Sequence, residues 1–193
     1  MKGLSIRINN IILLIGRRGS GKTFYTKQQI EAILKSGVHS RIILFDTFDH
    51  ESYREYPIVD IKYVTALTAG VCRVLTSEFK FESHLAFIKN YVRNALLIFE
   101  DAGKYIIGSV GEQFRNVLLD TKQKNIDVLI QYHGVGDVPP TLYRYADYIV
   151  LFKINDNLQA YRSKIPSFPS FEKHYKHVLA HPSPYYNEVF KIN

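Results

Sequence analysis

The chain has 193 residues, which is enough for one domain with a substantial hydrophobic core. With 46% hydrophobic and 22% charged residues it has the composition of a globular protein, and no apolar run approaches the length of a membrane span. The single cysteine, Cys72, excludes an internal disulfide and suits a reducing compartment. A formal net charge of +7 allows an acidic partner such as nucleic acid, although charge alone does not establish one.

The first residues of the chain alternate between apolar and polar side chains. Leu4, Ile6 and Ile8 predict a half-buried strand, which Asn9 and Asn10 would turn back on the next strand. Because the two asparagines interrupt the apolar stretch, a signal peptide is not expected.

Apolar runs alternate with segments of helical periodicity through most of the chain. Strands are expected over residues 11–15, 41–46, 57–64, 71–75, 95–101, 126–131 and 147–153. Helices are expected over residues 23–35, 81–94 and 112–124. Strands that alternate with helices indicate an α/β fold with a mostly parallel sheet wrapped by helices.

The last part of the chain has a different composition. From residue 166 on it holds four of the seven prolines and six phenylalanine or tyrosine residues. We therefore expect a core over residues 1–165 and a Pro- and aromatic-rich C-terminal appendage of the same domain over 166–193, extended except for a short helix near 171–179. His174, His177 and His181 have a spacing that would suit a metal, but no cysteine accompanies them. A solvated helix face is the favoured interpretation, and zinc is not expected.

Three glycines in six residues follow the first core strand, although glycine loses more conformational freedom on folding than any other residue. Their spacing with Lys22 and Thr23 reads G-x-x-x-x-G-K-[ST], the phosphate-binding loop, placed between an apolar strand and a helix that Gly37 closes. The loop N–H groups and the helix N-terminus would bind phosphate oxygens, Lys22 would reach the β- and γ-phosphates, and the Thr23 hydroxyl would hold Mg²⁺. The residues expected to contact the nucleotide are Gly16, Arg17, Arg18, Gly19, Ser20, Gly21, Lys22, Thr23 and Phe24.

Two acids end the apolar run "ALLIFED". Ligands gather at the carboxyl ends of strands in open α/β sheets, where Glu100 would serve Mg²⁺ through its bound water and Asp101 would polarise the attacking water. The apolar residues before the pair argue against two ordinary surface acids. Gln131, which closes "NIDVLIQ", is the third candidate, because an amide at the tip of a buried strand can sense the γ-phosphate and hold the water.

The motifs "GRRGSGKT", "LLIFED" and "KQKNIDVLIQYHGVGDVPPTLYRYADYIVLF" occur in an order that resembles the FtsK/HerA-type P-loop ATPases. Their small viral members, the genome-packaging ATPases, and the phage morphogenesis ATPases that resemble zonula occludens toxin are the most similar in pattern. The resemblance covers roughly residues 11–153, and the matching positions are Gln131, Pro139, Pro140, Arg144 and Asp147. It implies an additional-strand, RecA-like P-loop NTPase core, which is a three-layer sandwich around a mostly parallel sheet.

The resemblance also implies a function. It points to an ATP-hydrolysing motor that uses ATP and Mg²⁺ and translocates or packages double-stranded DNA as a homo-oligomeric ring. A capsid or portal-like component is a further partner that it allows, and the host cytoplasm or the virion is the implied location. An arginine that acts across a subunit boundary belongs to this picture. Arg115 and Arg144 are the candidates, and Lys122 is a third if lysine replaces arginine.

The chain departs from the family pattern at two places. The family usually has Asp followed by Glu, whereas Glu100 precedes Asp101 here. The first acidic side chain is therefore one methylene longer than in the family pattern, and the second is one methylene shorter. Relatives often carry an arginine before the glutamine strand, where this chain offers Lys122 and Lys124.

Two other classes of protein stay open on the sequence. One is a nucleotide-gated assembly or secretion factor with weak ATPase activity, which the exchanged acids allow. The other is a small-molecule kinase, although no arginine cluster beyond Arg17 and Arg18 suggests a kinase lid. A GTPase is not expected, because no Asn-Lys-x-Asp signature occurs. Turnover that DNA stimulates would separate the motor from both alternatives.

Overall fold

The structure, a computed structural model, describes residues 9–192. The strand expected around Leu4 to Ile8 lies outside the described residues. None of the helices within residues 9–192 is long and apolar enough to cross a lipid bilayer.

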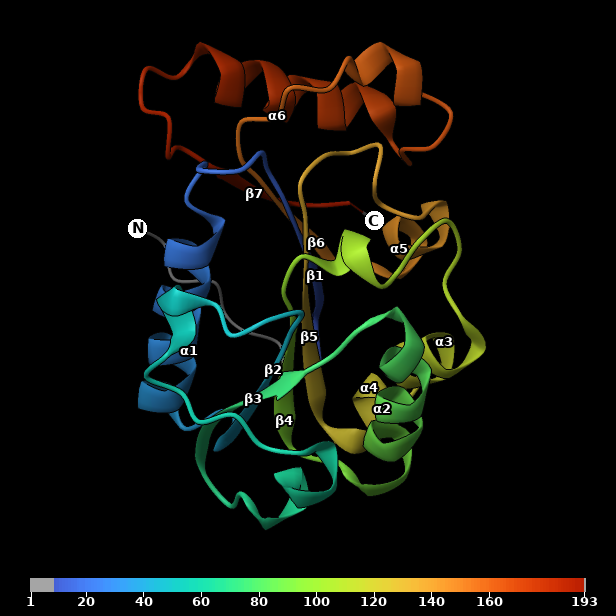
Figure 1. The fold of residues 1–193 in the computed structure, drawn as a ribbon. Coiled ribbons are helices and arrows are strands. Elements are labelled where there is room, and N and C mark those ends of the chain that lie inside the picture. Colours follow the sequence, from blue (N-terminus) through green and yellow to red (C-terminus); the bar gives the residue numbers. More distant parts are fainter. Residues whose placement is uncertain (1–8, 193) are drawn as a thin grey trace.

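A seven-stranded sheet forms the centre of the described chain, in the order β3-β2-β4-β5-β1-β6-β7 (Figure 1). Every neighbouring pair is parallel except β6 and β7. Strand β5 therefore separates β1 from β4, which is the extra strand that the additional-strand core requires. The strands are β1 (Ile11–Ile15), β2 (Arg41–Asp46), β3 (Gly70–Leu75), β4 (Ala95–Phe99), β5 (Ile126–Tyr132), β6 (Tyr148–Leu151) and β7 (Glu188–Lys191).

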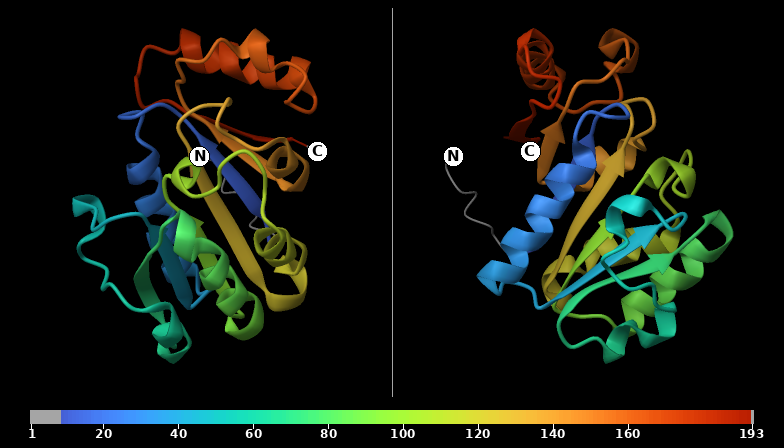
Figure 2. Two further views of the ribbon diagram at one scale, coloured as in Figure 1. Left: turned by 45° about the vertical axis from the view of Figure 1, so that its right-hand side comes forward. Right: turned by 60° about the vertical axis from the view of Figure 1, so that its left-hand side comes forward.

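Helices cover both faces of the sheet and make the expected three layers. Helix α1 (Lys22–Ser36) lies on one face, and the opposite face carries α2 (Glu78–Tyr91), α3 (Glu112–Leu119), α4 (Thr121–Lys124) and α5 (Pro140–Tyr145) (Figures 1 and 2). Alternate residues of β1 serve the two layers: Leu14 packs with Ile30 of α1, whereas Leu13 belongs to the larger core on the other face. The predicted α/β fold with a mostly parallel sheet is confirmed.

Several elements differ from the sequence-based expectation. Residues 57–64 form no strand beyond an isolated bridge from Ile58 to Arg73, because the Asp60 side chain accepts from the Lys62 N–H and starts a 3-10 helix over Ile61–Ala66. The helix expected over 112–124 is divided into α3 and α4 at Asp120. The one expected over 81–94 begins and ends three residues earlier as α2, and α5 was not expected as a helix.

The C-terminal part of the chain completes the sheet. Helix α6 (Phe168–Ala180) is longer than expected and packs on the sheet edge, where the Phe171 and Phe190 rings lie 5.6 Å apart. Strand β7 then pairs antiparallel with β6. Of the three histidines expected on a solvated helix face, His177 is exposed, and both His174 and His177 contact the Glu188 carboxylate of this strand. The division into a core over 1–165 and an appendage stays a prediction.

Candidate nucleotide and metal site

The loop after β1 needs glycine for two separate reasons. Gly19 and Gly21 have φ angles of 75° and 97°, a left-handed conformation that residues with a Cβ rarely adopt. Gly16 needs space instead, because a Cβ there would lie 2.5 Å from the Cβ of Phe152 and 2.6 Å from the Ser20 hydroxyl. The chain therefore accepts the conformational entropy lost by three glycines, because only glycine allows both these backbone angles and this close approach.

Backbone hydrogen bonds fix the start of the loop to both neighbouring strands. The Gly16 N–H donates to the Tyr132 carbonyl at 3.1 Å, at the end of β5, and the Arg17 N–H donates to the Lys153 carbonyl at 2.9 Å, just beyond β6. The sheet therefore holds the start of the loop.

The Lys22 side chain folds back toward the backbone of its own loop. Its Nζ donates to the carbonyls of Gly16 at 2.5 Å and Arg17 at 3.2 Å, and it lies 3.3 Å from Nδ1 of His133. Burial lowers the pKa of Lys22, while the negative charges of Glu100 and Asp101 act in the opposite direction. A cation is thus held where the loop would receive phosphate.

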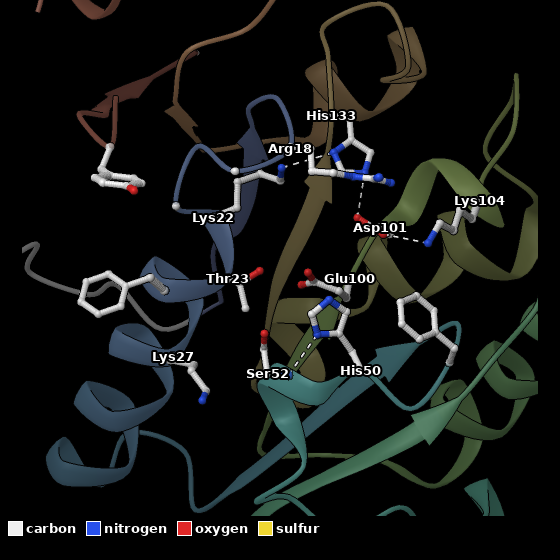
Figure 3. A pocket seen from close by; sticks show the side chains of 15 residues that line it. Arg18, Lys22, Thr23, Lys27, His50, Ser52, Glu100, Asp101, Lys104 and His133 are labelled. Carbon is white, nitrogen blue, oxygen red and sulfur yellow. Dashed lines mark hydrogen bonds and ion pairs between the residues drawn. The ribbon is translucent and has the colours of Figure 1, made fainter. Parts of the chain in front are cut away.

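A cavity of about 780 Å³ opens beside this loop at the carboxyl ends of the strands (Figure 3). Helix α1, the segment after β2 and the ends of β4 and β5 surround it. Its charged lining consists of four cations, Arg18, Lys22, Lys27 and Lys104, and two acids, Glu100 and Asp101, together with His50 and His133. The excess of positive charge suits a polyanion such as a nucleotide triphosphate.

Glu100 is a buried carboxylate with two side-chain donors. It is 5% exposed, the Tyr53 hydroxyl donates to its Oε2 at 3.0 Å, and the Gln131 amide donates to the same oxygen. Burial raises the pKa of Glu100 to about 8, and the negative charge of neighbouring Asp101 adds to the shift. The Glu100 carboxylate and the Thr23 hydroxyl face the same part of the cavity (Figure 3).

Asp101 has the opposite electrostatic environment. Its backbone is left-handed, with φ 47°, and its carboxylate pairs with His133 Nε2 at 3.0 Å and Lys104 Nζ at 2.8 Å. The hydrogen bond from His133, followed by that from Lys104, holds the pKa of Asp101 well below its usual range. Two adjacent acids thus titrate far apart, which is the arrangement that allows them different chemical roles.

Gln131 lies deeper than its position near a strand end predicts. It is fully buried, its Nε2 donates to Thr26 Oγ1 at 3.0 Å and to Glu100, and it does not line the cavity. Gln131 is therefore connected to the cavity through Glu100 and through Thr26 of α1. His133 is the residue of this segment that reaches the cavity, and the sequence reading missed it. Residues two positions apart on a strand point to the same face, so the position of His133 two residues after Gln131 could have indicated its place beside the site.

The arginines predicted from the sequence are distributed over different surfaces. Arg18 lines the cavity, whereas Arg17 turns away and donates to Asn155 at 3.1 Å. Arg115 on α3 and Arg144 on α5 are exposed, and neither lines the cavity. The third candidate, Lys122 on α4, is exposed as well. Lys104, which was not singled out from the sequence, lies in the cavity wall beside Asp101.

The donor set of the cavity fits Mg²⁺. Thr23 and Glu100 offer a hydroxyl and a carboxylate, which are hard oxygen ligands. No group of three or more His, Cys, Asp or Glu side chains that could hold a metal occurs within the described chain. Mg²⁺ commonly takes one or two protein oxygens and completes its shell with water and substrate phosphates.

These features define the P-loop NTPase class: a strand, a glycine loop with a buried lysine, a helix and an acidic strand end, joined in this strand order. No protein-family model and no curated protein matches the chain. Solved structures do. The genome packaging NTPase B204 from Sulfolobus turreted icosahedral virus 2, in complex with ATP-gammaS, is 20% identical with a TM-score of 0.75, over 95% of this chain and 92% of that one.

Two further structures of similar proteins agree. B204 of the same virus in complex with sulfate has a TM-score of 0.75 at 20% identity, over 97% of this chain and 94% of that one. The DNA-packaging ATPase B204 from Sulfolobus Turreted Icosahedral Virus has a TM-score of 0.71 at 22% identity, over 97% and 94%. The predicted likeness to small viral genome-packaging ATPases is confirmed at the level of the fold, over nearly the whole of both chains.

The buried Glu100 predicts how the stability of the metal-free protein depends on pH. Between its usual pKa of 4.5 and about 8, the unfolded chain ionises Glu100 while the folded chain keeps the proton, so the free energy of unfolding falls as pH rises. Glu100→Gln removes this contribution. In urea unfolding with EDTA, we expect the variant to gain on the order of 3 kcal/mol relative to wild type between pH 5 and pH 9.

The exposed Glu31, changed to Gln, is the matched control and should follow the wild-type curve. Parallel pH profiles for wild type and Glu100→Gln would contradict a raised pKa at this carboxyl.

Proposed function

We propose that this chain is an ATP-hydrolysing, Mg²⁺-dependent motor that packages or translocates double-stranded DNA for a virus or mobile element. One observation carries the proposal: the glycine loop, buried Lys22 and the unlike acids Glu100 and Asp101 meet in one cavity at the carboxyl edge of the sheet. The likeness to genome-packaging NTPases over nearly equal chain lengths supports it.

The loop residues would bind the phosphates. Backbone N–H groups of the loop and the N-terminus of α1 provide donors and partial positive charge. Lys22 would exchange the carbonyls of Gly16 and Arg17 for β- and γ-phosphate oxygens, and Arg18, Lys27 and Lys104 add positive charge around them. Thr23 and Glu100 would hold Mg²⁺, which when bound neutralises developing charge on the phosphates.

Asp101 is the residue best suited to orient the attacking water. Its low pKa keeps it ionised, and His133 and Lys104 fix its two oxygens in different directions. An ionised carboxylate in fixed orientation can accept a hydrogen bond from water at the γ-phosphate and so orient that water. Glu100 would hold the metal after losing its proton, and Gln131 and Tyr53 would keep its carboxylate in place.

The wider assembly is also part of the proposal. The net charge of +7 suits non-specific contacts to DNA phosphates, and a ring would bring an arginine from a neighbour to the cavity. A capsid or portal-like component is the proposed structural partner, in the host cytoplasm or the virion. The kinase and the weakly active assembly factor are not favoured, since the similar solved structures are packaging NTPases.

Lys22→Ala tests the active site. Removing the buried ammonium should lower kcat/KM for ATP by about 100-fold or more, because its charge acts on the phosphates in the transition state. Lys35→Ala, in the last turn of α1, is the matched control and should leave the rate unchanged.

Double-stranded DNA should stimulate ATP hydrolysis by the wild-type protein, and the affinity of the protein for DNA should fall steeply as the salt concentration rises. Parental hydrolysis by Lys22→Ala would refute the site, and unstimulated turnover would count against the motor.

His133→Ala tests the orientation of Asp101. Loss of a charge-assisted hydrogen bond should lower kcat about tenfold or more, with a smaller change in KM. Asp101→Asn should lower kcat further while keeping nucleotide binding, and the double variant should resemble Asp101→Asn alone, because both changes affect one unit. Additive losses in steady-state kinetics would show that His133 acts independently of Asp101. His177→Ala, in the C-terminal helix, is the control.

Mixed rings test the arginine in trans. Lys22→Ala subunits are inactive in their own site but can complete a neighbour's, and Arg144→Ala or Arg115→Ala subunits have the opposite defect. Mixing should restore part of the ATPase activity with the correct arginine, and Lys122→Ala is the third candidate to combine. Full activity from a monomer, or no recovery in any mixture, would leave the shared site without support.

A further inference from the structure

A second cavity continues the nucleotide site on the other side of the glycine loop. It measures about 510 Å³, and Gly21, Phe24 and Tyr185 line both cavities. We infer that this second cavity binds the nucleobase, stacked between Phe24 and Tyr185, and that it favours purines. The inference rests on the proposed function, since it assigns the remaining part of the same nucleotide.

Two aromatic rings stand at the junction of the cavities with most of their surface in solvent. Phe24 is 67% exposed and Tyr185 is 65% exposed. They come from opposite ends of the chain, Phe24 from the first turn of α1 and Tyr185 from the segment between α6 and β7. Flat bases stack favourably on such rings, and a purine offers a larger stacking area than a pyrimidine.

The position of Tyr185 relative to the loop fits this role. A Cβ built on Gly21 would lie 3.4 Å from Tyr185 Cδ1, so the ring stands directly against the loop that would hold the phosphates. A ligand that leaves the loop past Gly21 therefore meets the Tyr185 ring first. The floor beyond is apolar, with Tyr25 and Phe152 packed edge to face at 5.8 Å.

Two amide side chains, Gln28 and Asn187, also line the second cavity. Gln28 follows Phe24 by one helical turn, and Asn187 follows Tyr185 by two residues. Each amide has both donors and an acceptor and can present either to the edge of a base. Because both amides can turn over, the site should distinguish purines from pyrimidines better than adenine from guanine.

Hydrogen bonds and a ring stack hold the segment that carries Tyr185. The Tyr185 N–H donates to Ser183 Oγ at 3.2 Å, and the Ser183 N–H donates to His181 Nδ1 at 3.1 Å. The His181 ring stacks on Tyr186 at 3.8 Å, and its carbonyl accepts from Lys153 Nζ at 2.6 Å, next to the anchor of the glycine loop. The Pro- and aromatic-rich tail thus fixes the backbone that carries Tyr185, which limits the backbone entropy lost on binding.

Calorimetric titration in Mg²⁺ with ATP, UTP and inorganic tripolyphosphate tests the inference. Tyr185→Ala should raise the Kd for ATP about tenfold and leave the Kd for tripolyphosphate unchanged, because only ATP has a base. Tyr185→Phe keeps the ring and should stay within about twofold of wild type. Tyr91→Ala removes a tyrosine of similar exposure, 63%, at the end of α2 and is the matched control. Wild type should bind ATP more tightly than UTP, and Tyr185→Ala should reduce that difference.

The outcomes separate the two proposals. An unchanged Kd for ATP in Tyr185→Ala, or an equal loss for ATP and tripolyphosphate, would overturn the base site while the phosphate site stands. Equal affinity of wild type for ATP and UTP would overturn the purine preference. A wild-type protein that binds neither ATP nor tripolyphosphate would overturn the proposed function, and the base site with it.

Discussion

The buried carboxylate of Glu100 is the constraint around which this site is organised. It comes from the end of β4, and its donors come from the segment after β2, through Tyr53, and from β5, through Gln131. An ionised carboxylate in this place is costly, as its raised pKa shows, so the packing around it is tolerable only with these donors and nearby cations. In the proposed function, this carboxyl would lose its proton when it binds a metal ion.

A short chain of contacts connects the phosphate loop with the second acid. Lys22 Nζ lies against His133 Nδ1, and His133 Nε2 lies against Asp101 (Figure 3). When Lys22 turns to phosphate, His133 loses one neighbour and keeps the other. Binding at the loop would therefore change the contacts of His133, which also holds Asp101, the carboxylate proposed to orient water. The shared histidine makes these groups one unit, which is why their substitutions should not be additive.

Much of this architecture could be predicted from the sequence, and the exceptions have physical reasons. Strands such as β4 are buried throughout, so continuous apolar runs mark them, and the glycine loop has a fixed spacing. Strand β7 is half exposed at a sheet edge and depends on pairing with β6, which local pattern does not reveal. His133 meets Lys22 from 111 residues away, and Gln131 turns toward Thr26 on the α1 face, so only the fold decides their contacts.

The positions of the cations suggest what a single subunit lacks for catalysis, namely a further arginine at the cavity. Lys104 stands in the cavity wall, yet it is already paired with Asp101, and Arg18 is the arginine that the lining includes among residues 9–192. Arg115 and Arg144 belong to α3 and α5, on the face opposite α1 (Figure 1). If that face of one subunit met the cavity edge of the next, the contact would be head to tail, and head-to-tail contacts close into rings when their rotation allows. In the proposed ring, Arg115 or Arg144 of one subunit would then lie near the cavity of the next.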